Sequence, residues 1–139
     1  MSKFLYQIRV DVTKTLAEEL KNKNYSEDIA DMVNNLKSKN AILVCQYDAF
    51  KGFLDECDSN NQQGTVLYKW TKDTVNDKEK KEKYKKSFTV YIGQEQLYKK
   101  ELAEIILKDI KNVNNKSILK VRIIDSNPAN NPQPPKKYF

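Results

Sequence analysis

Histidine is absent from this chain of 139 residues, and glycine is scarce, with three residues. Without histidine there is no Ser-His-Asp triad, no Cys-His pair and no imidazole ligand for a metal ion. Three glycines do not form either of the common phosphate-binding loop motifs. No apolar run approaches the roughly 18 residues of a membrane span, and the N-terminus leads into an alternating pattern instead of a signal-peptide core. We therefore expect a cytoplasmic protein without a cofactor or a metal.

Two cysteines are present, and neither lies in a pattern typical of a nucleophile. Cys45 ends an apolar run, where cysteine behaves as a small hydrophobic residue. Cys57 lies between Glu56 and Asp58, and neighbouring acids make the reactive thiolate scarce. We expect both thiols to be reduced, and a disulfide between them is the alternative.

Arginine is also rare, because Arg9 and Arg122 are the only two arginines beside a large excess of lysine. The 25 basic residues exceed the 19 acidic ones and give a net charge of +6, which invites a nucleic-acid interpretation. Lysine, asparagine and isoleucine have A/T-rich codons, so an AT-rich genome gives this mixture whatever the partner. Lysine also lacks the planar guanidinium group with which arginine makes bidentate hydrogen bonds to phosphate. The net charge alone is therefore a weak indication of nucleic-acid binding.

Hydrophobic periodicity divides most of the chain into strands and helices. Apolar residues alternate cleanly over residues 4–12, which predicts the first strand. Thr13 or Thr15 is expected to begin the first helix. Further strands are predicted over residues 41–47, 65–71, 87–93 and 118–125, and further helices over residues 26–40, 48–57 and 94–113.

Two segments lie outside this pattern. Residues 72–86 are the most charged stretch, and we expect a solvated helical excursion within a long hairpin connection. Residues 127–139 contain all four prolines and no periodicity. They form either a disordered end or an arm stiffened by proline, whose terminal Tyr138 and Phe139 anchor on a neighbouring surface.

The element order predicts an α+β protein with a single mixed or antiparallel sheet and helices mainly on one face. The closest simple template is a ferredoxin-like βαββαβ core with an extra short helix, formed by residues 1–126 as one domain, with residues 127–139 as a Pro/Asn-rich arm. A thioredoxin-like α/β order is the alternative, and the absence of a C-x-x-C motif speaks against it. An architecture does not by itself give a function.

A polar stripe on the first and last strands is the most informative feature. In a ferredoxin-like sheet these strands are neighbours, so both arginines would share the face opposite the apolar one. Tyr91 and Thr89 would join them from another strand, and Lys69 would do so in some registers. The predicted ligand-binding residues are Arg9, Arg122, Gln7, Asp11, Lys120 and Tyr91.

We expect a small interaction or ligand-binding protein, a homodimer, that holds an anionic small molecule or a protein partner on this face. A second subunit or the C-terminal arm would close the site, whereas the simplest alternative is a solvated sheet face. Another alternative is a nucleic-acid-binding module that uses the lysines of residues 72–86 with the aromatic rings of Tyr91, Tyr68 and Trp70. A small enzyme that works without histidine is the last alternative. No catalytic or metal-binding residue is assigned.

Overall fold

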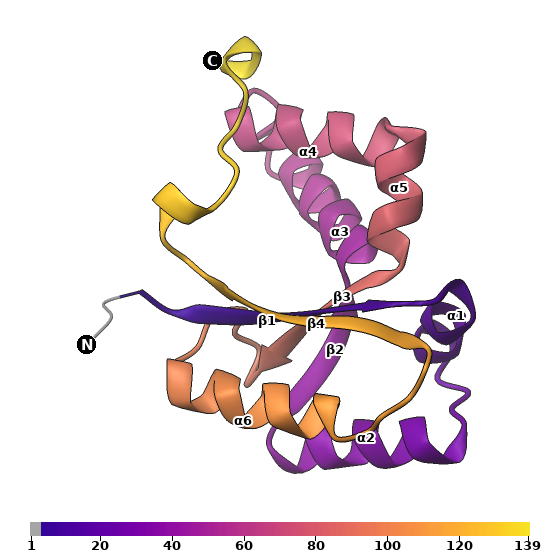
Figure 1. Cartoon of the computed structure of the whole chain (residues 1–139). Coiled ribbons are helices and arrows are strands. Elements are labelled where there is room, and N and C mark those ends of the chain that lie inside the picture. The colour runs from indigo at the N-terminus through magenta and orange to yellow at the C-terminus, as the bar shows by residue number, and fades with distance from the viewer. Residues whose placement is uncertain (1–3) are drawn as a thin grey trace.

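The first strand, β1, lies inside an open, antiparallel sheet of four strands in the computed structural model, which describes residues 4–139 (Figure 1). The strand order is β2-β3-β1-β4, so the first and last strands are neighbours. The protein therefore belongs to the α+β class. The strands are β1 (Tyr6–Val12), β2 (Ala41–Cys45), β3 (Ser87–Ile92) and β4 (Ile118–Asp125).

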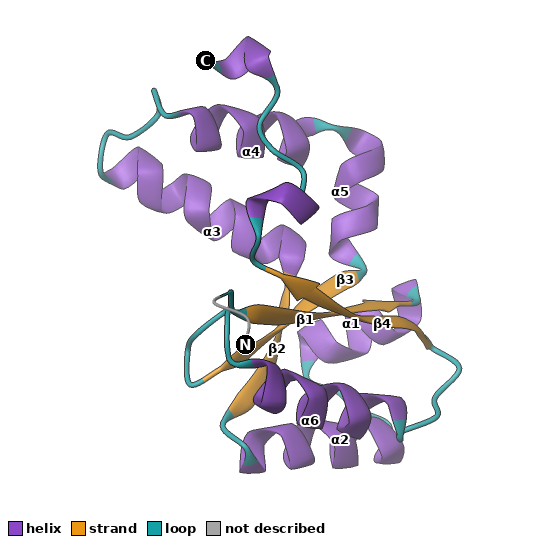
Figure 2. Ribbon diagram, turned by 60° about the vertical axis from the view of Figure 1, so that its left-hand side comes forward, coloured by secondary structure: helices purple, strands orange, loops and turns teal. Residues whose placement is uncertain are grey.

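Six α-helices accompany the sheet within the described residues, and they cover both of its faces (Figure 2). Helices α1, α2 and α6 lie against one face, while α3, α4 and α5 form a separate lobe over the other. The prediction that helices lie mainly on one face is therefore wrong. The helices are α1 (Lys14–Asn22), α2 (Glu27–Ser38), α3 (Gln46–Ser59), α4 (Val66–Asn76), α5 (Lys78–Lys85) and α6 (Lys100–Lys111).

The main core lies between the sheet and helices α1, α2 and α6. Alternation along β1 turns Ile8 and Val10 into this core, where both are almost completely buried. Each covering helix contributes an apolar stripe at helical spacing, as Ile106 and Ile110 of α6 illustrate. Packing of this face fixes the register of β1, because a slip of one residue would expose every core side chain. The opposite, polar side of β1 then faces the lobe.

The helical lobe is one long connection between β2 and β3. β2 pairs with β3 in antiparallel register, and the chain between them forms α3, α4 and α5 before it returns. The helix expected over residues 48–57 is present as α3 and the expected helical excursion is present as α5, whereas α4 takes the place of a predicted strand. Because every strand pair is antiparallel, the sheet does not fit the thioredoxin-like α/β alternative, which needs parallel strands.

Helix α4 occupies the segment for which the sequence predicts a strand over residues 65–71, and that prediction is wrong. The side chain of Thr65 accepts a hydrogen bond from the backbone N–H of Tyr68, so Thr65 caps the helix. The Tyr68 hydroxyl donates to Asp58 at the end of α3, which fixes α4 against α3. Tertiary packing on a neighbouring helix thus outweighs the strand preference of an aromatic, β-branched segment.

The other predicted elements are confirmed with shifted ends. Strand β2 stops at Cys45, and α3 begins at once with Gln46. Helix α6 begins only at Lys100, because Tyr98 first bridges to Tyr6 on β1. No helix within residues 4–139 is both long enough and apolar enough to pass through a membrane.

The C-terminal arm leaves β4 and runs from the sheet to the far side of the lobe, where it passes α4 (Figure 1). Short 3-10 turns over Pro128–Asn130 and Lys136–Tyr138 interrupt its extended path. The Tyr138 hydroxyl donates a hydrogen bond to Asp73 on α4, whereas Phe139 is 82% exposed. The two terminal aromatic residues were predicted to anchor the arm on a neighbouring surface. Tyr138 contacts α4 of the same chain, whereas Phe139 is exposed to solvent.

Candidate functional site

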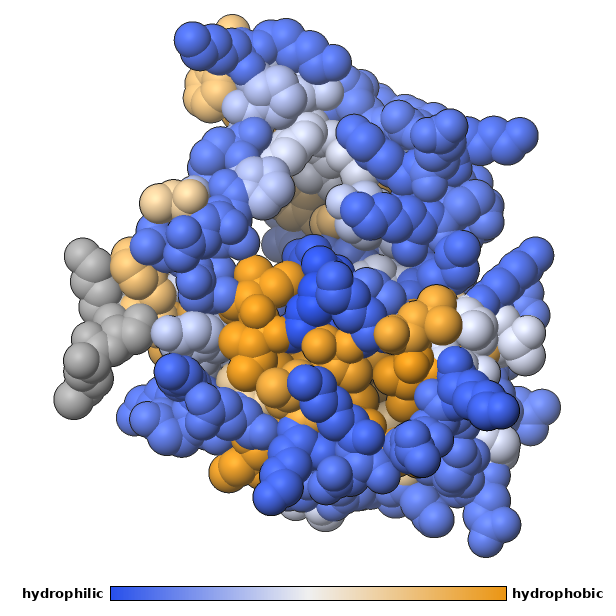
Figure 3. Space-filling view, in the orientation of Figure 1, coloured by the Kyte–Doolittle hydropathy of each residue, from blue (hydrophilic) through white to orange (hydrophobic). Residues whose placement is uncertain are grey.

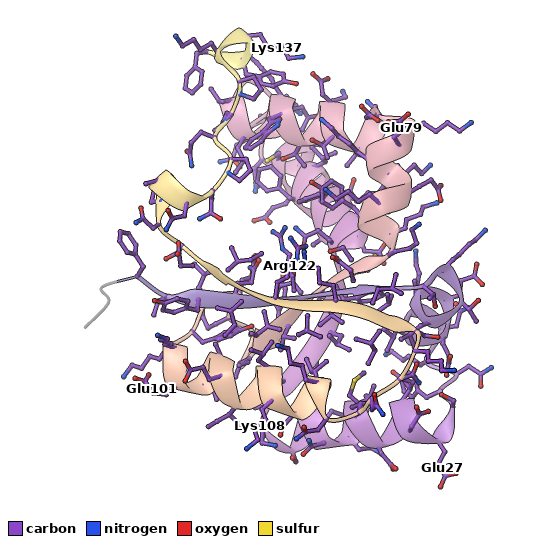
Figure 4. All side chains as sticks on the ribbon, in the orientation of Figure 1. Glu27, Glu79, Glu101, Lys108, Arg122 and Lys137 are labelled. Atoms are coloured by element: carbon purple, nitrogen blue, oxygen red, sulfur yellow. The ribbon has the colours of Figure 1, made fainter. Side chains whose placement is uncertain are left out.

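Arg9 and Arg122 are direct neighbours across strands β1 and β4. They are opposite partners in the antiparallel register, as are Gln7 and Ile124. Opposite residues share a face of the sheet, and here that face is the one below the helical lobe. Figure 4 shows Arg122 in the space between the sheet and the lobe. The structure thus brings both arginines of the chain onto a common surface.

The hydrogen-bonding needs of the two guanidinium groups are only partly met. A terminal nitrogen of Arg122 lies 3.3 Å from the Asp11 carboxylate. The Nε of Arg122 is buried and has no hydrogen-bond partner among the described residues. The Nε of Arg9 donates to the side-chain oxygen of Gln7 at 3.1 Å, and no carboxylate of residues 4–139 lies within 4 Å of Arg9. Each arginine therefore retains donors for a further acceptor.

Burial makes the charged form of the Arg9 side chain less favourable than it would be in water. Desolvation is the largest cause that lowers the pKa of Arg9, and the positive charge of Arg122 lowers it further, while Tyr84 and Asp11 act in the opposite direction. Two like charges face each other on neighbouring strands, an arrangement that costs stability. An anion placed between them would relieve both the repulsion and the lost hydration.

Helices of the lobe form the roof above these arginines. One face of α4 points down at them, since Leu67, Trp70, Thr71 and Thr74 follow one another at helical spacing and all line the space. Phe50 of α3 and Tyr84 of α5 complete the roof as an edge-to-face aromatic pair, with ring centroids 5.0 Å apart. The roof is therefore aromatic and hydroxyl-bearing, whereas the floor is cationic.

The C-terminal arm closes one side of the same space. Two amide nitrogens tie the arm to the end of β4, because Asn130 donates to the Asp125 carboxylate and Asn131 donates to the Asp125 carbonyl oxygen. Asn130, Asn131 and Pro132 line the wall. In the space-filling view the molecule is hollowed between the arm and the lobe (Figure 3).

Together the floor, roof and arm line a cavity of about 720 Å³ that is open to solvent on one side. Three of the described side chains that line it are cationic, Arg9, Arg122 and Lys83, and one is acidic, Asp125. The Asp125 carboxylate already accepts hydrogen bonds from the backbone of Asn127 and the side chain of Asn130. The balance of charge in the cavity is therefore positive, and its size suits a small organic molecule.

The predicted site residues divide into those inside and those outside the cavity. Gln7, Arg9 and Arg122 line it, and Asp11 contacts Arg122 from beside it. Lys120 lies opposite Asp11 but is exposed, and it borders a smaller hollow of about 250 Å³ near the end of α6. Tyr91 pairs with β2 and does not border the cavity, and burial raises the pKa of its hydroxyl. The structure thus brings four of the six predicted residues together.

The sequence interpretation missed the roof. Trp70 and Tyr68 were expected side by side on a strand, whereas α4 turns Trp70 into the cavity and buries Tyr68 against α3. Lys69 is an exposed residue of α4 and does not join the sheet face. The helical spacing of Leu67, Trp70, Thr71 and Thr74 was the available signal for this wall.

Comparisons with known proteins add no family: no protein-family model, curated protein or solved structure matches the chain.

Within residues 4–139 no three His, Cys, Asp or Glu side chains gather closely enough to hold a metal ion. The side chains that line the cavity carry guanidinium, ammonium, amide, hydroxyl, aromatic and aliphatic groups, with Asp125 as the one carboxylate among the described residues. The guanidinium and ammonium groups can bind and orient an anion through charge-assisted hydrogen bonds.

Proposed function

We propose that the protein binds a small molecule that carries a carboxylate or phosphate group next to an aromatic or apolar part. The anionic group would lie on the floor, between Arg9 and Arg122, and the apolar part would lie under Trp70 and Leu67. Arginine beside aromatic side chains is a combination suited to such ligands.

The observation that carries the proposal is the buried, unpartnered Nε of Arg122. A buried donor without an acceptor costs on the order of 1–3 kcal/mol, and here it lies opposite a second arginine that has no carboxylate partner among the described residues. Binding of an anion against the exposed part of the Arg122 guanidinium would offset the repulsion between the two charges and the cost of this buried donor. A fully solvated sheet face, the simplest alternative, fits these features less well, because both arginines are partly buried and the Arg122 side chain is 36% exposed.

The cavity walls favour a ligand with a flat apolar part over a bare inorganic anion. Phe50, Trp70 and Tyr84 present aromatic surface, and Leu67 and Leu97 add aliphatic surface. A cavity of about 720 Å³ is also far larger than a phosphate ion needs.

Trp70 supplies a direct reporter, because it is the only tryptophan of the sequence and lines the cavity. The experiment titrates the protein with anilinonaphthalenesulfonate, an aromatic anion, and follows both Trp70 quenching and energy transfer to the probe. N-phenylnaphthylamine, which has the same rings without the sulfonate, is the uncharged comparison. We expect the wild type to bind the anionic probe more tightly than the neutral one.

Arg9→Met and Arg122→Met should each weaken binding of the anionic probe by about tenfold or more, since each removes charge-assisted hydrogen bonds. Binding of the neutral probe should change little. Lys108→Met on α6, an exposed lysine on the other side of the sheet, is the matched loss of one charge and should leave both affinities unchanged. Equal binding of both probes, or an equal effect of all three variants, would show that the arginines are not the anion site.

Loss of fold is a separate outcome that this design detects. Arg122→Met removes the buried donor and the repulsion with Arg9, and leaves the half-exposed Asp11 without its ion pair. Removal of the buried donor gains about 1–3 kcal/mol, and loss of the partly exposed ion pair costs about 1 kcal/mol or less. The urea midpoint of this variant should therefore lie at or above that of the wild type.

We also propose a finer description of the architecture. The order β2-β3-β1-β4, with helical connections from β1 to β2 and from β3 to β4, corresponds to a ferredoxin-like core. Helices α3, α4 and α5 would then be an insertion between its second and third strands. On this view the site lies where the insertion closes over the core, in a protein that we place in the cytoplasm.

A further inference from the structure

Three lysines surround one aromatic ring where α3 and α5 meet, and of these four residues Lys51 is exposed while the other three are half-buried. The ammonium groups of Lys51, Lys81 and Lys85 lie 5.9, 5.7 and 5.5 Å from the centre of the Tyr47 ring. All three charges therefore lie within about 12 Å of one another. None of these four residues borders the cavity described above. We call them the Tyr47 cluster.

The cluster is built by two helices. Tyr47 and Lys51 are four residues apart on α3, and Lys81 and Lys85 are four residues apart on α5, so each pair shares one helix face. Contacts between the two helices bring these faces together. Sequence alone could not have joined Lys51 to the lysines of residues 72–86.

Close ion pairs offset little of the positive charge of this cluster. Among residues 4–139, the one carboxylate within 4 Å of its lysines is that of Glu82, which lies 3.9 Å from Lys85 on an exposed surface. Asp48, next to Tyr47 in the chain, pairs instead with Lys21 at 3.3 Å. Like charges four residues apart destabilise a helix such as α5, so the arrangement has a cost that a bound polyanion would offset.

From this we propose that the Tyr47 cluster binds the phosphate backbone of a nucleic acid. Lysine ammonium groups bind phosphates as point charges, and several of them on one surface match a chain of phosphates better than a single small anion. The lysines themselves flank the Tyr47 ring, so contact would be with the backbone and independent of base sequence. This surface differs from the predicted platform of Tyr91, Tyr68 and Trp70, which the fold does not assemble.

A membrane surface fits the cluster less well. Binding of a helix to a bilayer needs an apolar face that inserts below the headgroups. The one aromatic residue of α5, Tyr84, instead packs against Phe50 inside the lobe. Nucleic acid is therefore the polyanion that we propose. Binding to anionic vesicles is measured in the same experiment as the alternative.

The experiment measures binding of a fluorescein-labelled oligothymidylate and of a labelled DNA duplex by anisotropy, from about 50 to about 200 mM salt. We expect binding that weakens as salt increases. A triple variant, Lys51→Ala, Lys81→Ala and Lys85→Ala, should bind more weakly. The slope of log affinity against log salt should fall by about 2 for the single strand and by nearly 3 for the duplex. Comparison of the two affinities shows whether the cluster prefers single-stranded or double-stranded nucleic acid.

A matched triple variant separates the cluster from net charge. Lys100, Lys108 and Lys111 are exposed lysines of α6 on the opposite side of the sheet. Their replacement by alanine removes the same charge and should leave the slope nearly unchanged, whereas arginine at positions 51, 81 and 85 should preserve binding. No binding at low salt, equal losses in both alanine triples, or tighter binding to phosphatidylserine vesicles than to either nucleic acid would overturn the proposal.

Discussion

Tyr98 joins two strands through its hydroxyl, deep in the main core. The hydroxyl accepts a hydrogen bond from the backbone N–H of Ile8 at 2.8 Å and donates to the carbonyl oxygen of Val90 at 2.9 Å. The residue is 6% exposed. Tyr98→Phe would leave both backbone groups buried without this partner, so we expect a loss of about 1–3 kcal/mol in the free energy of unfolding near neutral pH.

Tyr98 should also make the free energy of unfolding depend on pH in the alkaline range. Burial raises the pKa of Tyr98 to about 12, whereas an unfolded tyrosine titrates near 10. A raised acid pKa contributes stability that is complete below pH ~10 and is lost as the pH rises from about 10 to about 12. Wild type should therefore lose up to about 1.4 kcal/mol per pH unit more than Tyr98→Phe over this window. Urea midpoints of both proteins at several alkaline pH values measure it, and parallel curves would contradict it.

At the residue scale, the placement of Arg9 and Arg122 could be predicted, because alternation in two amphipathic strands fixes which side chains share a face. Pairing of the first and last strands then placed the two side by side. The cover over them could not be predicted from the same pattern. The polar face of these strands is partly buried because the helices of the lobe pack over it through tertiary contacts. The alternation within β1 and β4 does not indicate that such a cover exists.

At the element scale, the C-terminal arm acts as a wall of the cavity. Its Asn130 and Asn131 hold to Asp125, and Tyr138 reaches Asp73 on α4. Removal of residues 127–139 should expose Trp70, so the rate at which acrylamide quenches its fluorescence should rise. Tyr138→Phe keeps the arm and removes one hydrogen bond, and it should give a smaller rise. Identical quenching of all three proteins would mean that the arm does not cover the site.

Helix α4 shows why an element can be misassigned. Val66, Tyr68 and Trp70 alternate and favour a strand, while Leu67, Trp70 and Thr71 have helical spacing in the same few residues. Both patterns are present, and the choice is made by contacts outside the segment: Tyr68 bonds to Asp58 on α3. Strong, long patterns such as β1 and α6 have no competing period, which is why those elements could be predicted.

At the scale of the whole molecule, the chain exposes more surface than its mass requires. A compact monomer of 16.3 kDa exposes about 7,500 Å², whereas this chain exposes 9179 Å². Part of the excess is the hollow between the sheet and the lobe. Another part is apolar, since Figure 3 shows hydrophobic side chains gathered over β4 and α6, where Leu119 is 64% and Ile105 is 49% exposed.

This apolar surface lies beside the open edge of β4, and we expect a second copy of the chain to cover it. An antiparallel edge strand can pair with its own copy about a two-fold axis. On β4, Ile118, Val121 and Ile123 pack against the core, and Leu119 beside the register shift is apolar and 64% exposed. The charges of Lys120 and Arg122, of the kind that usually protect an edge, lie on the other face. Wild type should therefore sediment at twice 16.3 kDa. Leu119→Lys should give monomers, because it places a charge in the interface. Ile42→Lys on the opposite edge strand, at a residue 51% exposed, is the matched control and should stay dimeric. A monomeric wild type would refute the homodimer, and dissociation by Ile42→Lys alone would place the contact on β2 instead.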